Sequence, residues 1–337
     1  MKQWAVAVIK FHIVITYTAF CSQKIWKTSE YDADWYNNEN LNSDESFYSG
    51  FGSSPLARSA LLERQEQLQY KCDQMTRENP LEPIEEPKAF ENLLVDDRHR
   101  LLYCYVPKVA CTNWKRVLMI ATGKWKGDLP QEIPADLAHA TNTFQRLSNL
   151  SMTEIQEKLA TYNKLIVVRH PFERLLSAFR NKFETKHEKS STYFQSRYGT
   201  EIIEKYRPNA TEKSLLRGDD VTFGEFVDFI VEDNRYGNPN EHWNSISRLC
   251  HPCLVNYNLI SKYETLSEDA VEILKQIHKH SVQFPLGPRN SEPTAKIMDR
   301  YYLQLSLSQL RALAEIYRSD LYLFDYSIEQ VLGYTIV

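Results

Sequence analysis

The sequence predicts an α/β fold, in which a central parallel β-sheet is flanked by helices within one large domain. Residues 101–106 read as a buried strand, and residues 165–168 have no polar face, as expected of a central parallel strand. Each stretch runs directly into a helical pattern, and two strand-to-helix crossings of this kind favour a parallel sheet with helices on its faces. The chain has 337 residues, of which 42% are hydrophobic, so it is long enough to bury a large core.

The N-terminal segment is apolar but interrupted. Residues 4–20 are mostly apolar and contain Lys10 and His12, and they number fewer than the roughly 20 apolar residues that span a bilayer. No small-residue cleavage site follows clearly. We expect residues 1–21 to be a membrane anchor or a signal segment. Two glycosylation sequons, at Asn149 and Asn209, support a secretory route weakly, because such triplets also arise by chance.

A stem is expected between this segment and the folded domain. Residues 22–55 are rich in Ser, Asn, Asp and Tyr without periodicity, which indicates an extended, solvated segment. Residues 56–78 show helical spacing of leucines among charges, which fits a coiled stalk or an isolated surface helix. A proline-rich acidic linker follows. We therefore expect a stem over residues 22–95 and a folded domain over residues 96–337.

Positive charge is concentrated in the middle of the chain. The formal net charge is −4, but residues 98–217 hold 21 basic and 11 acidic side chains, a net charge of +10. Residues 28–97 have a net charge of −11 and residues 218–337 one of −7. A positive field of this kind favours anionic ligands and speeds their encounter.

The six cysteines are too few for a disulfide scaffold at this length. Cys250 and Cys253 have the spacing of a redox pair or of half a zinc site. A zinc site needs two more ligands, and no second pair with matching spacing exists. We expect structural cysteines in disulfides, with the two active roles as alternatives.

The first strand ends in a loop with the layout of a phosphate-binding loop but without glycine. The N–H groups of residues 110–113 are expected to face an anion at the start of a helix over residues 113–122. Lys108 supplies a mobile positive charge, and Thr112 supplies a hydroxyl donor. The lysine precedes the turn, whereas the nucleotide-hydrolysing motif G-x-x-x-x-G-K-[ST] has it late, so a standard nucleoside triphosphatase is disfavoured.

A second loop follows the second strand. Pro171 suits the first turn of a helix that is expected to continue to about Lys186. Arg169 ends the strand, and Ser177 lies roughly 80° away from it around an ideal helix axis, so spacing alone does not place them on one face. The long Arg169 side chain can nevertheless lean toward Ser177 and form a second phosphate clamp. Because ligands bind at the carboxyl ends of parallel strands, one nucleotide with two separate anionic groups would satisfy both loops.

These motifs resemble those of a known family. The stretches "PKVACTNWKR", "RHPFERLLSAFRNKF", "HWNSISRLCHPC" (242–253) and "KYETLSEDA" (262–270) are similar to the Golgi carbohydrate sulfotransferases, closest to the chondroitin and dermatan 4-O type. The resemblance covers residues 95–330 and implies the sulfotransferase fold, with 3′-phosphoadenylyl sulfate as the sulfate donor. The cytosolic branch usually has glycine in the first loop, where this chain has Ala110 and Cys111.

The resemblance also implies which residues bind the donor. The first loop corresponds to the 5′-phosphosulfate loop, and the second to the 3′-phosphate site. The implied donor-binding residues are Pro107, Lys108, Val109, Ala110, Cys111, Thr112, Asn113, Arg169, His170, Pro171, Phe172, Glu173, Arg174, Leu175, Leu176 and Ser177.

The implied reaction moves an SO₃ group from a phosphate to an alcohol. Lys108 is placed to stabilise charge on the bridging oxygen, and His139, which lies between the loops in sequence, is the first candidate for the general base. In the family that the chain resembles, a histidine or glutamate in this interval has that role. His242 and Glu173 are the rival candidates. No metal is expected to be required, because Lys108 and the loop amides supply positive charge.

The expected acceptor is anionic. Arg180, Lys182 and His242 are predicted to contact it, and Trp243 could stack on a sugar ring. Further basic side chains of the same surface are Lys186, His187, Lys189, Arg197, Lys205, Arg207, Lys213 and Arg217. A groove with such edges suits a polymer of carboxylates and sulfates rather than a nucleic acid.

The resemblance favours O4 of N-acetylgalactosamine in chondroitin as the acceptor site. Dermatan, N-glycan N-acetylgalactosamine and glucuronate O3 stay open as alternatives, as does an inactive glycosaminoglycan-binding relative. The expected location is the Golgi membrane, with one N-terminal span of type II orientation and a lumenal catalytic domain.

Overall fold

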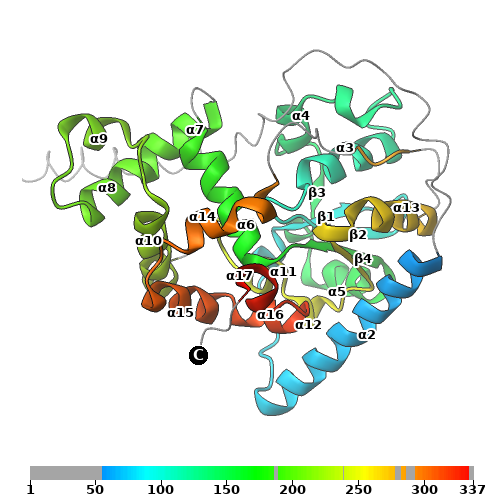
Figure 1. The fold of residues 1–337 in the computed structure, drawn as a ribbon. Helices are drawn as coiled ribbons and strands as arrows, with labels where there is room; N and C mark the ends of the chain where they lie inside the picture. The colour runs from blue at the N-terminus through cyan, green and yellow to red at the C-terminus, as the bar shows by residue number, and fades with distance from the viewer. Residues whose placement is uncertain (1–54, 186–188, 238, 278–281, 286–292, 334–337) are drawn as a thin grey trace, which may run out of the picture.

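The computed structural model describes residues 55–185, 189–237, 239–277, 282–285 and 293–333. The predicted signal-anchor over residues 1–21 lies outside the described residues, as do Cys21, Lys186 and His187. Figure 1 shows two parts, one built around a β-sheet and one built of helices, with helix α6 between them.

The sheet has five strands in the order β3-β1-β2-β4-β5. Strands β2, β4 and β5 are parallel, with Tyr103 opposite Leu165 and Ile166 opposite Ile260, whereas β1 is antiparallel to β2 and β3. The α/β class and the parallel centre of the sheet are therefore confirmed, and two antiparallel strands extend it on one side. The strands are β1 (Leu93–Asp96), β2 (Leu101–Cys104), β3 (Gln145–Arg146), β4 (Asn163–Val168) and β5 (Leu259–Lys262).

Helices cover the sheet. The helix predicted over residues 113–122 is α3, and it begins two residues earlier, directly after the first loop. The α-helices of this part are α2 (Pro55–Glu78), α3 (Cys111–Ala121), α4 (Ala135–His139), α5 (Met152–Thr161), α11 (Ile246–Cys250), α12 (Pro252–Val255) and α13 (Leu266–Gln276). Short 3₁₀ turns are η2 (Pro87–Phe90), η3 (Pro130–Glu132), η4 (Leu147–Asn149) and η7 (Tyr263–Thr265).

The helical part follows strand β4. The helix predicted to run to about Lys186 ends earlier as an α-helix, at Phe179, and continues as a π-helical turn. The elements are α6 (Pro171–Phe179), η5 (Arg180–Glu184), α7 (Lys189–Phe194), η6 (Gln195–Gly199), α8 (Thr200–Tyr206), α9 (Glu212–Arg217), α10 (Phe223–Tyr236), η8 (Thr294–Ile297), α14 (Met298–Tyr302), α15 (Leu307–Ile316), α16 (Arg318–Leu323) and α17 (Glu329–Leu332).

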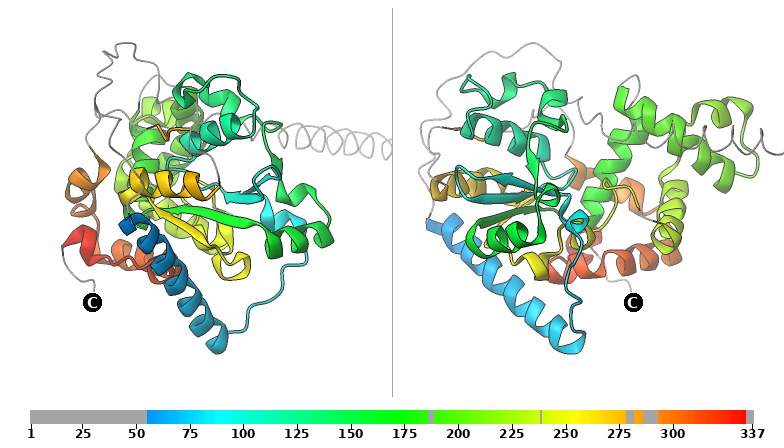
Figure 2. Two further views of the ribbon diagram at one scale, coloured as in Figure 1. Left: turned by 90° about the vertical axis from the view of Figure 1, so that its right-hand side faces the viewer. Right: turned by 180° about the vertical axis from the view of Figure 1, so that it is seen from behind.

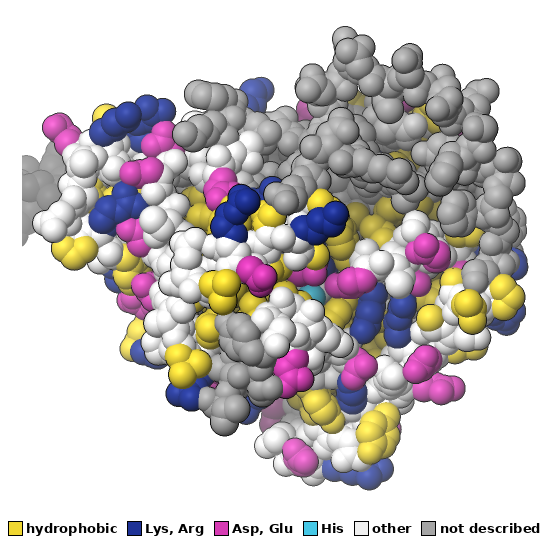
Figure 3. Space-filling view, viewed as in Figure 1, with side chains coloured by type: hydrophobic (Ala, Val, Ile, Leu, Met, Phe, Trp, Pro, Cys, Tyr) yellow, Lys and Arg dark blue, Asp and Glu magenta, His cyan; other side chains and the backbone are white. Residues whose placement is uncertain are grey.

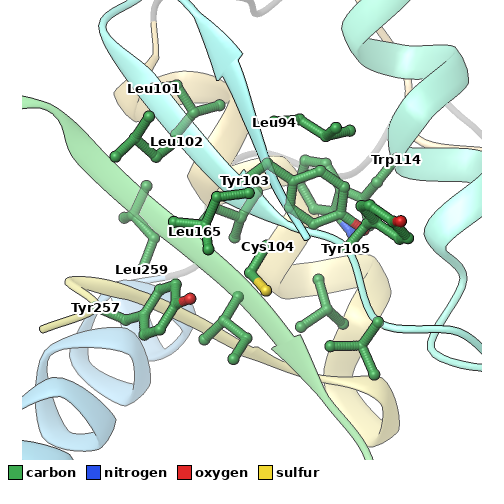
Figure 4. Packing of buried hydrophobic residues seen from close by; sticks show 14 of the residues in the cluster. Leu94, Leu101, Leu102, Tyr103, Cys104, Tyr105, Trp114, Leu165, Tyr257 and Leu259 are labelled. Carbon is green, nitrogen blue, oxygen red and sulfur yellow. The ribbon is translucent and has the colours of Figure 1, made fainter. Parts of the chain in front are cut away.

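Each part has its own hydrophobic core. One cluster surrounds the sheet, and Figure 4 shows Tyr103 beside Trp114 within it, with ring centroids 6.2 Å apart. The other is rich in aromatic rings, and Phe172 stacks on Tyr302 at 5.1 Å within it. Burying a side chain of this size stabilises the fold by about 1.5–3 kcal/mol. Because α6 follows β4 of the first core and packs in the second, it holds the two parts together.

Helix α2 is packed against the sheet part, as Figure 2 shows, and is not an isolated stalk. Leu61 and Leu68 are buried, and Arg64 pairs with the buried Asp269 at 2.6 Å. Strand β1 begins at Leu93, before the predicted domain start at residue 96. Both elements contribute buried side chains to the core around the sheet.

The expectation of disulfide-bonded cysteines is confirmed. Cys72 pairs with Cys253, and Cys104 pairs with Cys250. Since Cys250 and Cys253 each bond a distant partner, they form neither a redox pair with each other nor a zinc half-site. Cys111 is buried and is not part of a disulfide.

Candidate active site

The first loop turns through two left-handed residues and contains no glycine. Lys108 has φ 71° and Ala110 has φ 64°, and α3 begins at the next residue. A residue with a Cβ in this region costs roughly 1–2 kcal/mol. Left-handed residues in such a turn let successive N–H groups form an anion-binding concavity. The loop therefore takes the shape of a phosphate loop despite its sequence.

The buried side chain of Arg174 holds this loop in place through hydrogen bonds to backbone oxygens. Its Nε donates to the backbone oxygen of Pro107 at 2.9 Å, and its terminal nitrogens donate to the backbone oxygens of Asn244 at 2.6 Å and Glu241 at 2.7 Å. The side chain is almost fully buried. Arg174 was predicted to contact the donor, and the structure has its guanidinium supporting the loop and joining it to residues 241–244.

The start of α3 is anchored by Asn113, which was predicted to bind the donor, and by its neighbour Trp114. Asn113 Nδ2 donates to the backbone oxygen of Pro285 at 3.1 Å, so this amide holds a neighbouring segment. Trp114 is fully buried, and its ring centroid lies 4.9 Å from that of Phe284. Val109 is fully buried as well. For Val109 and Asn113, the backbone N–H groups are therefore the parts suited to an anion.

The second loop is closed by His170, which caps α6. Its Nδ1 accepts from the Phe172 N–H at 3.2 Å, so the ring proton sits on Nε2, which donates to the backbone oxygen of Ser327 at 2.9 Å. Burial lowers the pKa of His170 below its ordinary value. His170 is thus a neutral structural residue. Phe172, Leu175 and Leu176 are core residues of the same helix, and only their backbone could face a ligand.

Arg169 lies where both loops meet. Its Nη1 donates to the backbone oxygen of Lys108 at 3.1 Å, and its Nε donates to Glu173 Oε2 at 3.3 Å. The guanidinium carbon lies 4.1 Å from the centroid of the Tyr263 ring, a cation–π contact. Glu173, Ser177 and Arg180 are the partly exposed residues of the same helix face. Arg169 contacts Glu173 on this face, four residues before Ser177, and its clamp with Ser177 stays a prediction.

Lys108 has a side-chain partner that the sequence did not indicate. Its Nζ donates to Asn181 Oδ1 at 2.8 Å. Asn181 is buried in the π-helical turn η5. The signal in the sequence is only that Asn181 lies four residues after Ser177, one helical turn further along.

His139 lies against the first loop, at the end of α4. Its Nε2 is 2.9 Å from Thr112 Oγ1, and its Nδ1 is 3.0 Å from Lys115 Nζ. Lys115 is buried, and its ammonium lies 4.1 Å from the centroid of the Tyr105 ring. The predicted base is thus brought to the first loop, together with a lysine that the sequence analysis did not single out.

Two of the three predicted acceptor contacts are buried, and one is partly exposed. Lys182 is fully buried, where its Nζ donates to Ser190 Oγ at 2.7 Å and lies over the Phe194 ring. A buried ammonium cannot line a groove, so this assignment is corrected. His242 is also buried, with its Nδ1 2.7 Å from Asn240 Oδ1. Arg180 is partly exposed.

The basic surface is less continuous than predicted. Three of its members form ion pairs, namely Lys205 with Glu232, Arg207 with Asp220 and Glu225, and Arg217 with Asp219. On the face seen in Figure 3, dark blue and magenta side chains alternate. These pairs reduce the positive field that the charge count alone suggested.

The remaining predictions concern modification, metal and membrane. Asn149 and Asn209 are exposed, as an acceptor asparagine must be. Within the described ranges, no three His, Cys, Asp or Glu side chains gather as metal ligands would. None of the helices that the structure describes has the length and apolarity of a bilayer span.

Two loops whose backbones suit anions follow the neighbouring parallel strands β2 and β4, the place where α/β folds bind nucleotides. The family model described as "Sulfotransferase family" matches residues 91–327. The chain therefore belongs to the sulfotransferase family, and the fold expected from the resemblance is confirmed.

Its relatives agree with this assignment. Carbohydrate sulfotransferase 11 of Rattus norvegicus is 39% identical over 282 residues, which are 82% of this chain and 79% of that protein. Carbohydrate sulfotransferase 11 of Danio rerio is 37% identical over 272 residues, 80% of this chain and 76% of that protein. Carbohydrate sulfotransferase 8 of Homo sapiens is 37% identical over 246 residues, 72% of this chain and 57% of that protein. No solved structure gives a significant match.

Proposed function

We propose that this chain is a carbohydrate sulfotransferase that moves sulfate from 3′-phosphoadenylyl sulfate to O4 of N-acetylgalactosamine in chondroitin or dermatan. The observation that carries the proposal is the meeting of the two loops, where Arg169 donates to the backbone oxygen of Lys108 at 3.1 Å. A nucleotide that carries a sulfated phosphate at one end and a ribose phosphate at the other matches two linked anion sites.

The residues fit such a donor. The 5′-phosphosulfate would lie in the concavity between Lys108 and the start of α3, where backbone N–H groups and the Thr112 hydroxyl donate to it. The 3′-phosphate would lie on the α6 face formed by Arg169 and Ser177, because a guanidinium and a hydroxyl together suit a phosphate.

The reaction is an in-line displacement at sulfur. The bond between sulfur and the bridging oxygen breaks, a bond between sulfur and the acceptor oxygen forms, and the leaving oxygen stays with adenosine 3′,5′-bisphosphate. Lys108 stabilises the charge that develops on the bridging oxygen, supported by the N-terminus of α3. The acceptor hydroxyl loses its proton to a base, so the charges balance without a metal ion.

His139 is the proposed base because it lies 2.9 Å from Thr112, next to the phosphosulfate position. Its Nδ1 faces the Lys115 ammonium, which can only donate, so the ring proton sits on Nε2 in this arrangement. For Nε2 to accept a proton, the Lys115 contact must open when substrates bind. The anionic donor and acceptor offer that ammonium stronger partners than a ring nitrogen.

The rival bases are less well placed. Glu173 is engaged with Arg169 at the proposed 3′-phosphate end. His242 is buried within residues 241–244, which Arg174 ties to the first loop.

The acceptor assignment rests on the resemblance to the chondroitin and dermatan 4-O type. Relatives named carbohydrate sulfotransferase 8, 9 and 11 all align with this chain. They support a glycan as the acceptor but do not single out which glycan it is. Arg180 is a partly exposed cation three residues after Ser177, at the start of η5. We propose that it contacts an acidic group of the acceptor.

We further propose a Golgi location with a lumenal catalytic domain and an N-terminal anchor over residues 1–21. Two disulfides agree with an oxidising compartment. The exposed sequons at Asn149 and Asn209 support glycosylation in the same route. The folded unit then begins with α2, and the stem precedes it.

A sulfate-incorporation assay over a panel of desulfated polysaccharides, followed by disaccharide analysis, tests the proposal. We expect radiolabelled sulfate at O4 of N-acetylgalactosamine in chondroitin and dermatan. Sulfate at another position would still show a carbohydrate sulfotransferase, but it would contradict the proposed acceptor. Glycosaminoglycan binding without transfer or nucleotide affinity would instead support the inactive relative.

A further inference from the structure

One face of α6 and its π-helical extension connects the two ends of the proposed donor site. Arg169, Glu173, Ser177 and Asn181 follow one another at intervals of four residues. Neighbours at this spacing lie about one turn apart, and the row drifts by roughly 40° per step around an ideal helix axis. The first contact is present, since Arg169 Nε donates to Glu173 Oε2. The stripe therefore begins at the proposed 3′-phosphate clamp and ends at Asn181.

Both ends of this stripe hold Lys108. Arg169 Nη1 donates to the Lys108 backbone oxygen at 3.1 Å, and Asn181 Oδ1 accepts from the Lys108 ammonium at 2.8 Å. The backbone of the lysine is thus held by one end of the stripe and its side chain by the other. A lysine has a flexible four-carbon stem, so fixing its two ends removes most of its freedom.

The position of Asn181 is itself fixed by its surroundings. It lies in η5, the π-helical turn over Arg180–Glu184, and its side chain is buried. The Gln195 amide donates to the backbone oxygens of Phe183 and Thr185, both at 3.0 Å, and so clamps the end of this turn. Single π-helical turns are rare in proteins and are frequently found at functional sites.

We propose that Asn181 is a positioning residue for Lys108, which directs its ammonium to the bridging oxygen of the donor; this inference rests on the proposed function. An ammonium has three donors and an amide oxygen can only accept, so Lys108 can bond Asn181 and the donor together. A neutral amide leaves the positive charge of the lysine available. A carboxylate at the same place would neutralise it.

The test uses two variants of the active protein and one matched control. Asn181→Ala removes the acceptor, and Asn181→Asp keeps the shape but adds a negative charge. The control is Asn258→Ala, because Asn258 is another partly buried asparagine whose amide donates to Asn163, in the sheet and away from both loops. For each protein, kcat, the donor KM, the melting temperature and the pH profile of kcat are measured.

For Asn181→Ala we expect kcat to fall by roughly 10–100-fold, as misplaced catalytic groups do, with the donor KM changed by less than about 3-fold. For Asn181→Asp we expect a similar loss and an alkaline limb of the kcat profile moved to higher pH, because a carboxylate favours the charged lysine. Asn258→Ala should keep the kcat of the unmodified protein. If Asn181→Ala does not fold, the isosteric Asn181→Asp decides.

Unchanged kcat in the variant that folds, or a loss confined to the donor KM, would overturn the positioning role. An unchanged pH profile in Asn181→Asp together with full kcat would do so as well. The proposed enzyme class is judged separately, because it fails when the unmodified protein transfers no sulfate to any glycan of the panel.

Discussion

Arg169 and Lys108 belong to different loops, and the Nη1 of the first donates to the backbone oxygen of the second at 3.1 Å. Lys108 is also one of the two left-handed residues of its loop. The hydrogen bond therefore braces a strained turn from the neighbouring strand end. It also links the proposed 3′-phosphate site directly to the backbone of the proposed 5′-phosphosulfate site.

The two residues should nevertheless respond differently to substitution. Lys108→Ala should lower kcat by about 10³-fold or more, since it removes the charge that stabilises the leaving oxygen, with a modest change in nucleotide affinity. Arg169→Ala should mainly weaken nucleotide binding, by about 1.5–3 kcal/mol for a charged hydrogen-bond donor. Calorimetry with adenosine 3′,5′-bisphosphate and the sulfate-incorporation assay separate the two effects. Equal activity of Lys108→Ala and the unmodified protein would contradict the role of this lysine.

The glycine-free loop makes a prediction about stability. Ala110→Gly should leave the free energy of unfolding unchanged or raise it by up to about 1 kcal/mol, because glycine removes the left-handed strain but adds flexibility to the unfolded chain. Ala312→Gly, in the interior of α15, is the control and should cost about 1 kcal/mol. Urea denaturation measures both. A clear loss of stability in Ala110→Gly would show that the left-handed conformation at residue 110 carries no strain.

Because His139 contacts Thr112, substitutions of the two residues can separate the role of the proposed base from that of the loop hydroxyl. His139→Ala should lower kcat by about 10²–10⁴-fold if it removes general-base catalysis. It also removes the Thr112 contact, so Thr112→Val is the matched control. That variant should raise the donor KM with a much smaller loss of kcat, because the hydroxyl binds the donor. Equal kcat losses in the two variants would move the base to another residue.

Local hydrophobic patterns and short motifs were sufficient to predict the central strand and the main residues of the two loops. The strand at residues 165–168 has no polar face, and it is the central parallel strand β4. Lys108, Arg169 and Ser177 could be singled out because each stands at a strand end or on the helix that follows. Short strands of the sheet edge, such as β3 with two residues, have too few side chains for a periodic signal.

Tertiary partners could not be predicted in this way. Lys182 has the composition of a surface residue, but its ammonium finds Ser190 and an aromatic ring inside the helical part. Asn181 is an unremarkable residue in the sequence, and its contact with Lys108 joins positions 73 apart. Leu61 and Leu68 predict a helix, but the surface that buries them belongs to a distant part of the chain.

The disulfide between Cys72 and Cys253 should stabilise the protein without taking part in its chemistry. It ties α2 to α12 across 181 residues of sequence. Replacing both cysteines by serine should cost about 2–5 kcal/mol of unfolding free energy and leave kcat within about 2-fold. Each single variant should lose as much as the double variant, because either one removes the same bond. Melting temperatures with and without a reducing agent provide the measurement, and additive single losses would argue against the pairing.

The buried histidine that caps α6 predicts a loss of stability in acid. Burial lowers the pKa of His170, so the unfolded chain, with an ordinary pKa of about 6.5, binds a proton before the folded protein does. Stability due to neutral His170 is therefore present above about pH 6.5 and is lost as the pH falls through its lowered folded pKa. Burial lowers the pKa of His251 as well, so both residues contribute to the same window.

His170→Asn should reduce the slope of unfolding free energy between about pH 7 and pH 5, because asparagine can accept the Phe172 N–H without titrating. The slope of unfolding free energy against pH is compared rather than the stability at one pH, because the variant also loses the Ser327 contact and is therefore less stable at every pH. His251→Asn is the matched variant, because asparagine tolerates the left-handed conformation of that residue, and the double variant should have the shallowest slope. Denaturation curves across this range give the answer. A slope for His170→Asn equal to that of the unmodified protein would mean that His170 titrates alike in the folded and unfolded states.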